Sequence, residues 1–371
     1  METPDLGTKP VSADHKASSP SWREVLARLT LCCGLALGLY ALVCGGLLTP
    51  YINQGSDAGR VVGVFEGYDR IAATADRHRE LVLFWGSSMV REGVDCDLVE
   101  AQDPAVAAYN LSVSGDLPCR RLVELPRVES LRPARVVIGV SYPEIFETRA
   151  PFEDQIAALP GEAYRQMPPE AQALMDDRFR EIAGRSACER FWWKRKFLLS
   201  AVCWKLGVPD RSNPIPAGFV DNLKAPHVYT KDIAPAELGR FLHQCFGHYP
   251  PYTDGGAATP SESVSARSLE LLLRRLTAQH TEIVLVNMPL HPLLNAAVPA
   301  ERRTALRDYL TALAAPNVAI LDWQEALGPG CFVDLLHLNA QGRAAFTVRI
   351  TQHLAERPPQ TLSAAARSRW P

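Results

Sequence analysis

The sequence predicts an α/β fold with a mostly parallel sheet, and three observations support this. Short apolar runs such as Leu81–Trp85 and Arg135–Val140 end in turn residues, as strands buried on both faces do. Segments with helical spacing separate successive runs, which favours a sheet covered by helices on both faces. The 371 residues are 47% hydrophobic and 22% charged, which is ordinary for a globular protein with a large core.

The expected elements follow in order along the chain. The strands are expected at residues 81–85, 106–111, 135–140, 282–287 and 318–321. The helices are expected at residues 119–131, 266–280, 301–314 and 339–354, with Asn339 as the cap of the last helix. In such sheets ligands bind beyond the carboxyl ends of the strands, so the loops after the first four strands are the places to look for function.

Other segments set the domain organisation. Residues 51–80 are expected to be a connector with a helical end, and residues 81–356 to be the main domain. Residues 145–262 interrupt the alternation with prolines, aromatic residues and short helical pieces, and we expect an insertion or cap over the sheet edge. Residues 357–371 are expected to be a disordered tail.

One apolar stretch predicts a membrane anchor. Residues 29–48 contain no charged residue, and about 20 such residues span a hydrocarbon core as a helix. A cleaved signal peptide is the main alternative, but its apolar region would be shorter and small residues would mark the cut. Lys and Arg residues are concentrated before the stretch, which predicts a cytoplasmic tail at residues 1–28 and an extracytoplasmic remainder.

The charge balance argues against one other function, and several residue clusters leave further functions open. With 39 Lys+Arg against 41 Asp+Glu, the chain lacks the basic excess of a dedicated nucleic-acid binder. The aromatic and basic stretch at residues 191–205 fits either an amphipathic helix at a membrane interface or a half-buried helix. His243, Cys245 and His248 could ligate a metal, but no partner motif accompanies them, and we expect no metal or other cofactor. The sequence cannot choose a disulfide pattern for the six cysteines beyond residue 48.

The end of the first strand carries a candidate nucleophile. Residues 84–89 read Phe-Trp-Gly-Ser-Ser-Met, and a serine at a strand-to-helix turn has an exposed hydroxyl close to free backbone N–H groups. Taken alone, Gly-Ser-Ser is also a common turn.

A second candidate lies near the other end of the chain. Asp334 precedes His337 by three residues, just before the last helix. Such an aspartate can turn back to hold the imidazole and to stabilise the imidazolium that forms when it takes a serine proton. The alternative is an Asp–His pair in an ordinary loop.

Together these two pieces resemble the SGNH (GDSL-like) hydrolase family, which implies a three-layer α/β fold. By its position in the first block, Ser88 rather than Ser87 matches the nucleophile. Asp334 and His337 match the acid and base of the last block. The stretch at residues 109–115 resembles the second block, and the resemblance implies an oxyanion hole formed by the N–H groups of Ser88 and Gly115.

The third block departs from the family pattern. The family carries Gly-x-Asn-Asp, whose Asn completes the oxyanion hole, whereas residues 141–144 here read Ser-Tyr-Pro-Glu. Another group then substitutes for the Asn, or the activity is narrow or lost. Ser87 and His291, which follows the fourth strand, are candidate pocket residues; the alternative for His291 is a partly exposed turn histidine.

The overall plan resembles membrane-anchored proteins of cell-envelope acylation, such as D-alanyl transfer and alginate O-acetylation proteins. The resemblance implies a periplasmic or cell-surface domain that takes an acyl donor or an acylated glycan and works beside a multispanning membrane acyltransferase. It implies acyl transfer or removal through a seryl ester, with residues 29–48 in the lipid bilayer and no nucleic-acid partner. The alternatives are a catalytically inactive, glycan-binding or scaffold relative, and an unrelated anchored α/β protein.

Overall fold

A computed structural model describes residues 21–42, 57–76, 78–148, 153–159, 161–185, 223–224 and 233–356. The chain divides into two compact units, Met1–Thr49 and Pro50–Pro371. The described residues of the first unit form one helix, α1 (Trp22–Leu42). A capping box starts it: Ser21 N–H donates to Glu24 Oε2 at 3.1 Å, and Glu24 N–H donates to Ser21 Oγ at 3.3 Å.

Helix α1 overlaps the predicted membrane anchor only in part. It begins before Leu29, so that Glu24 and Arg28 belong to it. Within the described residues, no helix combines the length and the apolar character needed to cross a membrane. Residues 43–48 of the predicted span lie outside the described residues, and the anchor therefore stays a prediction.

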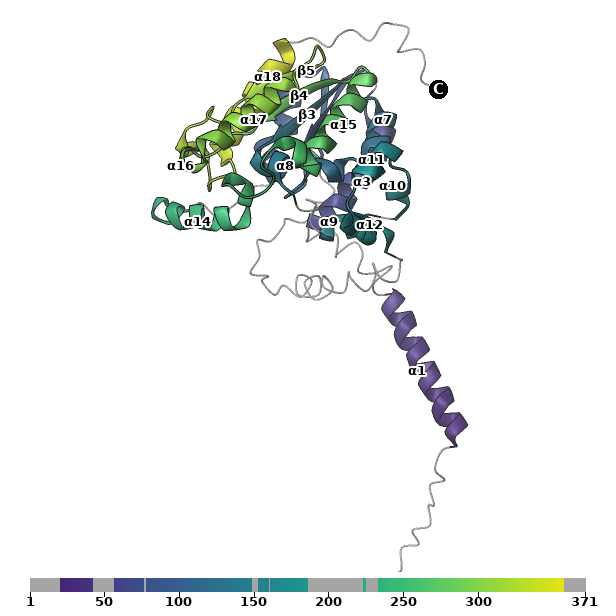
Figure 1. Ribbon diagram of the computed structural model, residues 1–371. Coiled ribbons are helices and arrows are strands. Elements are labelled where there is room, and N and C mark those ends of the chain that lie inside the picture. The colour runs from purple at the N-terminus through teal and green to yellow at the C-terminus, as the bar shows by residue number, and fades with distance from the viewer. Residues whose placement is uncertain are drawn as a thin grey trace, which may run out of the picture. The chain divides into compact units, whose positions relative to one another are not determined.

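The second unit contains a five-stranded sheet in which every neighbouring pair is parallel (Figure 1). The predicted α/β fold with a parallel sheet is thereby confirmed. The strand order is β2-β1-β3-β4-β5, which reverses direction between β1 and β3. The strands are β1 (Glu80–Trp85), β2 (Val106–Asn110), β3 (Arg135–Val140), β4 (Glu282–Asn287) and β5 (Val318–Asp322).

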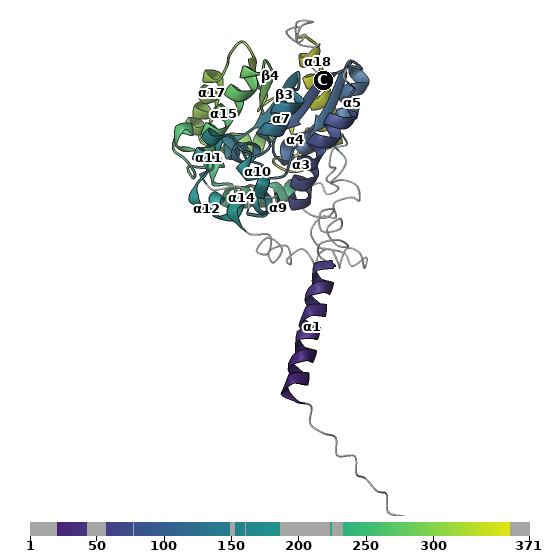
Figure 2. The same cartoon turned by 90° about the vertical axis from the view of Figure 1, so that its right-hand side faces the viewer.

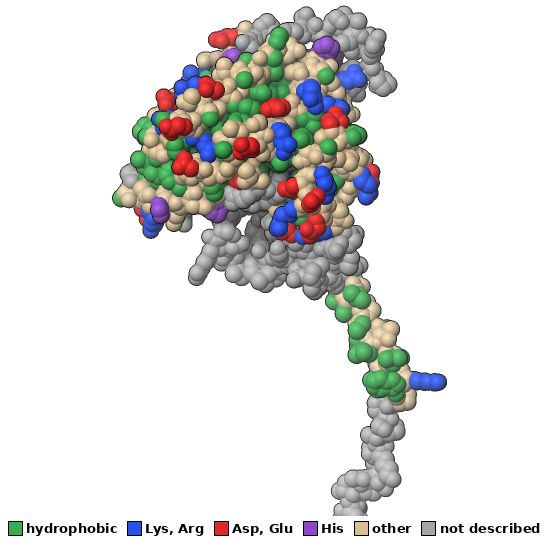
Figure 3. Space-filling view, viewed as in Figure 1, with side chains coloured by type: hydrophobic (Ala, Val, Ile, Leu, Met, Phe, Trp, Pro, Cys, Tyr) green, Lys and Arg blue, Asp and Glu red, His purple; other side chains and the backbone are tan. Residues whose placement is uncertain are grey.

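Helices pack on both faces of the sheet, because right-handed crossovers that run in opposite directions along it fall on opposite sides (Figure 2). On one face, α18 contacts both helices that link β1 to β2. These are α4 (Ser88–Gly93), α5 (Cys96–Gln102) and α18 (Ala340–Glu356). The other face carries α3 (Asp57–Thr74), α7 (Leu125–Leu131), α15 (Val264–Ala278) and α17 (Ala300–Ala312). The face drawn in Figure 3 shows acidic and basic side chains interspersed, in keeping with the net charge of −2.

Two helices differ from the sequence expectation. The single helix expected at residues 119–131 is α6 (Pro118–Arg121) followed by α7, because Pro126 has no N–H to continue a helix through this point. Helix α3 occupies much of the expected connector. It begins before the segment at the end of the connector where a helix was expected, and it packs into the core. Its buried side chains are Arg60, Val61, Val64, Phe65, Tyr68 and Ile71.

The region expected as an insertion is a set of short helices in its described parts. Described parts of it contact loops beyond the strand ends, where a cap was expected: Gln155 Nε2 donates to the Ser114 carbonyl at 2.5 Å, and the Ile233 N–H donates to the Val333 carbonyl at 2.8 Å. Other parts pack on the helices over the sheet face, and buried Ile156, Tyr164 and Phe179 join the main core. The helices are α8 (Tyr142–Phe146), α9 (Glu153–Ala158), α10 (Gly161–Arg165), α11 (Pro169–Leu174), α12 (Asp177–Gly184) and α14 (Leu238–His248), with α16 (Pro292–Ala297) after β4. The predicted stretch at residues 191–205 and the predicted tail at 357–371 lie outside the described residues. The cysteines of the described part, residues 32, 33, 96, 119, 245 and 331, are unpaired thiols.

Candidate active site

Two glycines let the helix that carries Ser88 sit directly on the strand ends. β1 ends at Trp85, Gly86 turns the chain with φ 154°, and Ser88 is the first residue of α4. A Cβ atom at Gly86 would clash with Val90 Cγ2, and so would one at Gly139 in β3. The close approach of α4 to β1 and β3 thus depends on the missing side chains, and it places Ser88 at the point where the strand order reverses.

Asn110, the last residue of β2, ties α4 to the next loop. Its Nδ2 donates to three carbonyl groups near the C-terminal end of α4 at 3.1–3.3 Å. Its Oδ1 accepts the N–H of Ser112 at 3.1 Å. One buried amide therefore fixes the loop that carries Gly115 against the helix that begins with Ser88.

The structure brings Ser88, His337 and Asp334 together. His337 Nε2 lies 2.9 Å from Ser88 Oγ, and His337 Nδ1 lies 2.7 Å from Asp334 Oδ2. Ser88 and His337 are partly exposed, whereas Asp334 is buried. The three side chains form a continuous hydrogen-bonded chain from a partly exposed serine to a buried carboxylate.

The tight turn between β5 and α18 fixes this orientation. Asp334 Oδ1 accepts the N–H groups of Leu336 and His337, each at 2.7 Å, so the carboxylate folds back over its own loop. The Val333 N–H donates to the His337 carbonyl at 2.9 Å and closes the turn. Asn339 Oδ1 accepts the Gly342 N–H at 2.9 Å and caps α18, as expected for this residue.

The electrostatics of the pair suit general-base chemistry. Burial alone would raise the pKa of Asp334, but the facing His337 and the two backbone donors lower it below its usual value. Burial opposes a charged imidazole, yet the nearby carboxylates of Glu92 and Asp334 raise the pKa of His337 above its ordinary value. An ionised Asp334 accepts from Nδ1–H, so the neutral ring presents the lone pair of Nε2 to the Ser88 hydroxyl.

Gly115 lies on a loop attached to the same strand ends. The Val113 N–H donates to the Gly86 carbonyl at 3.1 Å, which places the loop beside the β1 turn. Gly115 has φ 59°, in the left-handed region that favours glycine. Among the described residues, neither the N–H of Gly115 nor that of Ser88 has a hydrogen-bond acceptor. The two loops at these strand ends therefore carry two N–H groups that are free to donate.

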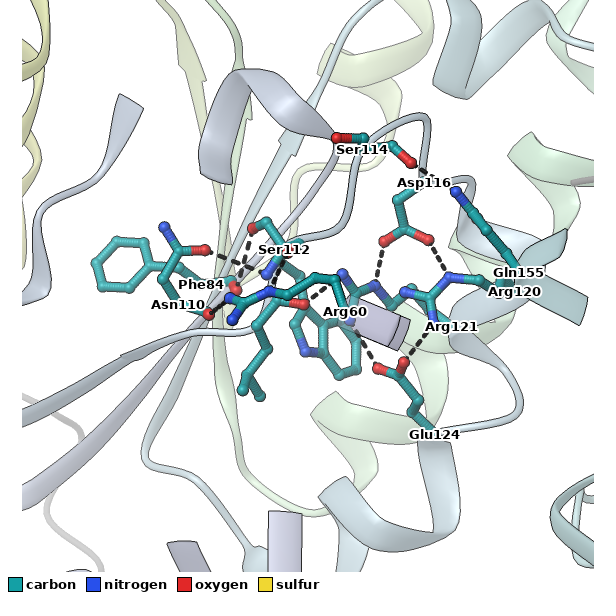
Figure 4. A network of polar contacts seen from close by, with 12 residues as sticks. Arg60, Phe84, Asn110, Ser112, Ser114, Asp116, Arg120, Arg121, Glu124 and Gln155 are labelled. Carbon is teal, nitrogen blue, oxygen red and sulfur yellow. Dashed lines mark hydrogen bonds and ion pairs between the residues drawn. The ribbon is translucent and has the colours of Figure 1, made fainter. Parts of the chain in front are cut away.

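A buried ionic network holds this loop from beneath (Figure 4). Asp116, next to Gly115, accepts hydrogen bonds from Arg120 and Arg121, and both arginines also donate to Glu124. The two arginines lower the pKa of Glu124, although its burial alone would raise it. From α3, Arg60 donates to the carbonyl groups of Asn110 at 2.6 Å and Ser112 at 3.3 Å.

Sequence reasoning missed this network, although its spacing carried a signal. Asp116, Arg120 and Glu124 follow one another at intervals of four residues, the spacing that pairs opposite charges on a helix. The sequence gives no sign that the three side chains are buried, because charged residues are mostly exposed.

A buried carboxyl group occupies the divergent third block. Glu144 Oε2 accepts the N–H and the hydroxyl of Ser141 at 2.9 and 2.8 Å, and Glu144 also pairs with the Ser87 hydroxyl. Burial raises the pKa of Glu144. Ser87, the N-cap residue of α4, is therefore buried behind Ser88 and bonded to this carboxyl.

His291 lies beside the Asp334–His337 turn. Its N–H donates to the Leu335 carbonyl at 3.1 Å, and its ring meets the Phe332 ring edge-on at 5.6 Å. Its Nδ1 accepts the Leu293 N–H at 3.1 Å and so caps α16. Burial lowers the pKa of His291, and because Nδ1 accepts a hydrogen bond, Nε2–H is the donor of the ring. The side chain is buried near the triad rather than partly exposed in a turn.

Glu92 is a second acidic residue that sequence reasoning missed. It is fully buried in α4, and its Oε2 lies 3.9 Å from His337 Nε2. The signal was its position four residues after Ser88, which places both on one face of a helix.

Of the three possible metal ligands, His243 and His248 are exposed on α14, whereas Cys245 is buried. Over the part of the chain that the structure describes, no group of three or more His, Cys, Asp or Glu residues is arranged to hold a metal ion.

No protein-family model matches the chain, and no curated protein matches it. Among solved structures, the chain is similar to the crystal structure of the lipase/acylhydrolase from Enterococcus faecalis, at 12% identity and a TM-score of 0.37, over 76% of this chain and 99% of that one. A likeness this low supports no argument about function.

Proposed function

We propose that this chain is a serine esterase or O-acyltransferase that acts on acyl groups of a cell-envelope glycan. The observation that supports it best is the hydrogen-bonded chain of Ser88 Oγ, the His337 imidazole and the Asp334 carboxylate, at 2.9 and 2.7 Å. A buried carboxylate that orients an imidazole against an accessible serine is the arrangement that activates a serine nucleophile.

The proposed reaction proceeds in two steps. His337 Nε2 takes the hydroxyl proton while Ser88 Oγ attacks the acyl carbonyl carbon, and the N–H groups of Ser88 and Gly115 stabilise the resulting oxyanion. The tetrahedral intermediate collapses, the imidazolium returns the proton to the leaving alcohol oxygen, and an acyl ester of Ser88 remains. Water or a sugar hydroxyl then attacks this ester with His337 as base, and Ser88 is regenerated.

The divergent third block affects the expected rate of the proposed acyl transfer. Losing one oxyanion donor costs about 3 kcal/mol of transition-state stabilisation, and no Asn stands at residues 141–144. The His291 Nε2–H group, on the neighbouring loop, is the proposed pocket donor. A chain that lacks an effective third donor fits a slow or narrowly specific enzyme, or the inactive scaffold relative that the sequence leaves as the alternative.

The proposal keeps the membrane anchor and its orientation. Residues 29–48 carry no charge and the cations precede them, which supports a cytoplasmic N-terminus and an extracytoplasmic catalytic unit. The proposed partners are the lipid bilayer, an acyl donor or acylated glycan, and a multispanning membrane acyltransferase.

The test uses the full chain in detergent, with a chemically O-acetylated polysaccharide and p-nitrophenyl acetate as substrates. We expect release of acetate or p-nitrophenol that Ser88→Ala abolishes and that Ser114→Ala, a substitution on the Gly115 loop, retains. If the folded chain releases neither product faster than its Ser88→Ala variant does, this result contradicts the proposed enzymatic activity and favours the inactive scaffold relative.

A further inference from the structure

A second carboxylate faces the imidazole from the side of Ser88. Glu92 is fully buried in α4, and its Oε1 accepts from Arg91 Nη2 at 3.0 Å. Its Oε2 lies 3.9 Å from His337 Nε2 and has no hydrogen-bond partner within the described part of the chain. A buried carboxylate oxygen left without a donor is costly, so its place against the imidazole calls for an explanation.

The surrounding fold keeps Glu92 in this position. Ser88 and Glu92 are four residues apart on α4 and so point from the same face of the helix. From α18, Arg343 Nε donates to the Glu92 carbonyl at 2.8 Å and fixes its backbone. Asn110 holds the same helical turn from the β2 side.

We propose that Glu92 is a positioning residue of the catalytic centre, which acts through His337. The 3.9 Å between Glu92 Oε2 and His337 Nε2 is too long for a hydrogen bond. In the resting state, Nε2 is therefore hydrogen-bonded to Ser88 Oγ, at 2.9 Å. Once His337 has taken the serine proton, the buried carboxylate stabilises the new positive charge at short range. This inference rests on the proposed function, in which His337 is the base.

The charges around His337 give the expected sign. Glu92 and Asp334 favour the imidazolium, and Arg91 disfavours it. Arg343 from α18 faces Glu92, and His291 on the neighbouring loop faces Asp334. Burial raises the pKa of Glu92, whereas His337 and Arg91 favour its ionised form. Removing that charge leaves Asp334 opposed by Arg91, so the imidazolium becomes less stable and the neutral base persists to lower pH.

The experiment measures kcat/KM for p-nitrophenyl acetate against pH with the full chain in detergent. We expect Glu92→Gln to move the acid limb to lower pH by about one unit, as for the loss of a charge within 4–6 Å. The plateau should fall by about tenfold, the factor equivalent to one pKa unit. Glu92→Asp should restore part of both changes. The control variant Glu129→Gln, whose part-buried carboxylate on α7 pairs with Arg275, should leave the profile unchanged.

A second readout does not depend on turnover. The pKa of His337, followed by NMR and assigned with His337→Gln, should be lower in Glu92→Gln than in the wild type. An unchanged pKa, or an acid limb that coincides with the wild-type limb, would overturn the proposal. If Glu92→Gln fails to fold, Glu92→Asp takes its place in the same comparison, because the shorter side chain moves the carboxylate away from His337. Absence of Ser88-dependent turnover with a shifted His337 pKa would instead contradict only the proposed function.

Discussion

A methyl group at Gly139 would test how the strands position Ser88. Gly139 lies in β3 directly beneath α4, and a Cβ atom there would clash with Val90 Cγ2. It would also lie 2.7 Å from Met288 Sδ and 3.0 Å from Met288 Cγ. Non-bonded carbon atoms prefer about 3.5–4.0 Å, so either these side chains or the whole of α4 must move by about 1 Å.

The two consequences have different sizes. Overpacking of this kind costs about 1–3 kcal/mol of the free energy of unfolding. Val90 is β-branched and stiff, so the helix that begins with Ser88 takes up much of the shift. A displacement of about 1 Å in a catalytic group can cost about 100-fold, and we expect Gly139→Ala to lower kcat/KM by roughly this factor.

The assay combines urea unfolding with hydrolysis of p-nitrophenyl acetate, and two variants serve as controls. Gly184→Ala places the same methyl group where nothing lies within 4 Å, and both quantities should stay near their wild-type values. Val90→Ala combined with Gly139→Ala removes the shortest of these contacts, leaves only the flexible Met288 side chain to move, and should recover most of the lost kcat/KM. Wild-type activity in Gly139→Ala, or no recovery in the double variant, would refute the account of how α4 is positioned.

Three further predictions follow from the same geometry. Asp334→Asn should lower kcat by about 10⁴ without loss of fold, because an amide no longer fixes the Nδ1–H tautomer, as circular dichroism and steady-state kinetics would show. Glu124→Gln should lower the free energy of unfolding in urea by about 3–5 kcal/mol, because the residue pairs with two buried arginines and a tyrosine. The wild-type kcat/KM should fall on the acid side with an apparent pKa above 6.5, because His337 must be neutral to act as a base and its pKa is raised.

Each of these has an outcome that contradicts it. Asp334→Asn at near wild-type kcat would show that the carboxylate does not orient the base. A Glu124→Gln variant as stable as the wild type would mean that water reaches the network. An acid limb at or below pH 6.5 would show that the carboxylates near the imidazole do not stabilise its charged form.

The sequence predicted best the strands that are buried along their whole length. All five strands were predicted within a residue or two, because strands covered on both faces read as uninterrupted apolar runs. The break before α7 was readable from Pro126, yet the helical spacing on either side favoured one helix. Helix α3 was underestimated, since its buried residues recur at helical spacing but include Arg60, which sequence reasoning assigns to the surface.

The candidate site illustrates the same limit. Ser88 and His337 are 249 residues apart in the chain, and only the parallel sheet brings the end of β1 to the turn before α18. Their chemistry was readable from local spacing, but their 2.9 Å separation was not. Glu92 and Glu144 were missed as site residues because nothing in the sequence shows that a given carboxyl group is buried against an imidazole or a neighbouring serine.

The central claim is that Ser88 is an activated nucleophile, and covalent labelling tests it most directly. The full chain in detergent is incubated with a fluorophosphonate, its intact mass is measured, and the labelled peptide is mapped. We predict one adduct on Ser88, absent from Ser88→Ala and formed much more slowly in His337→Gln. A folded chain that gains no adduct, or that is labelled equally in Ser88→Ala, would contradict the account.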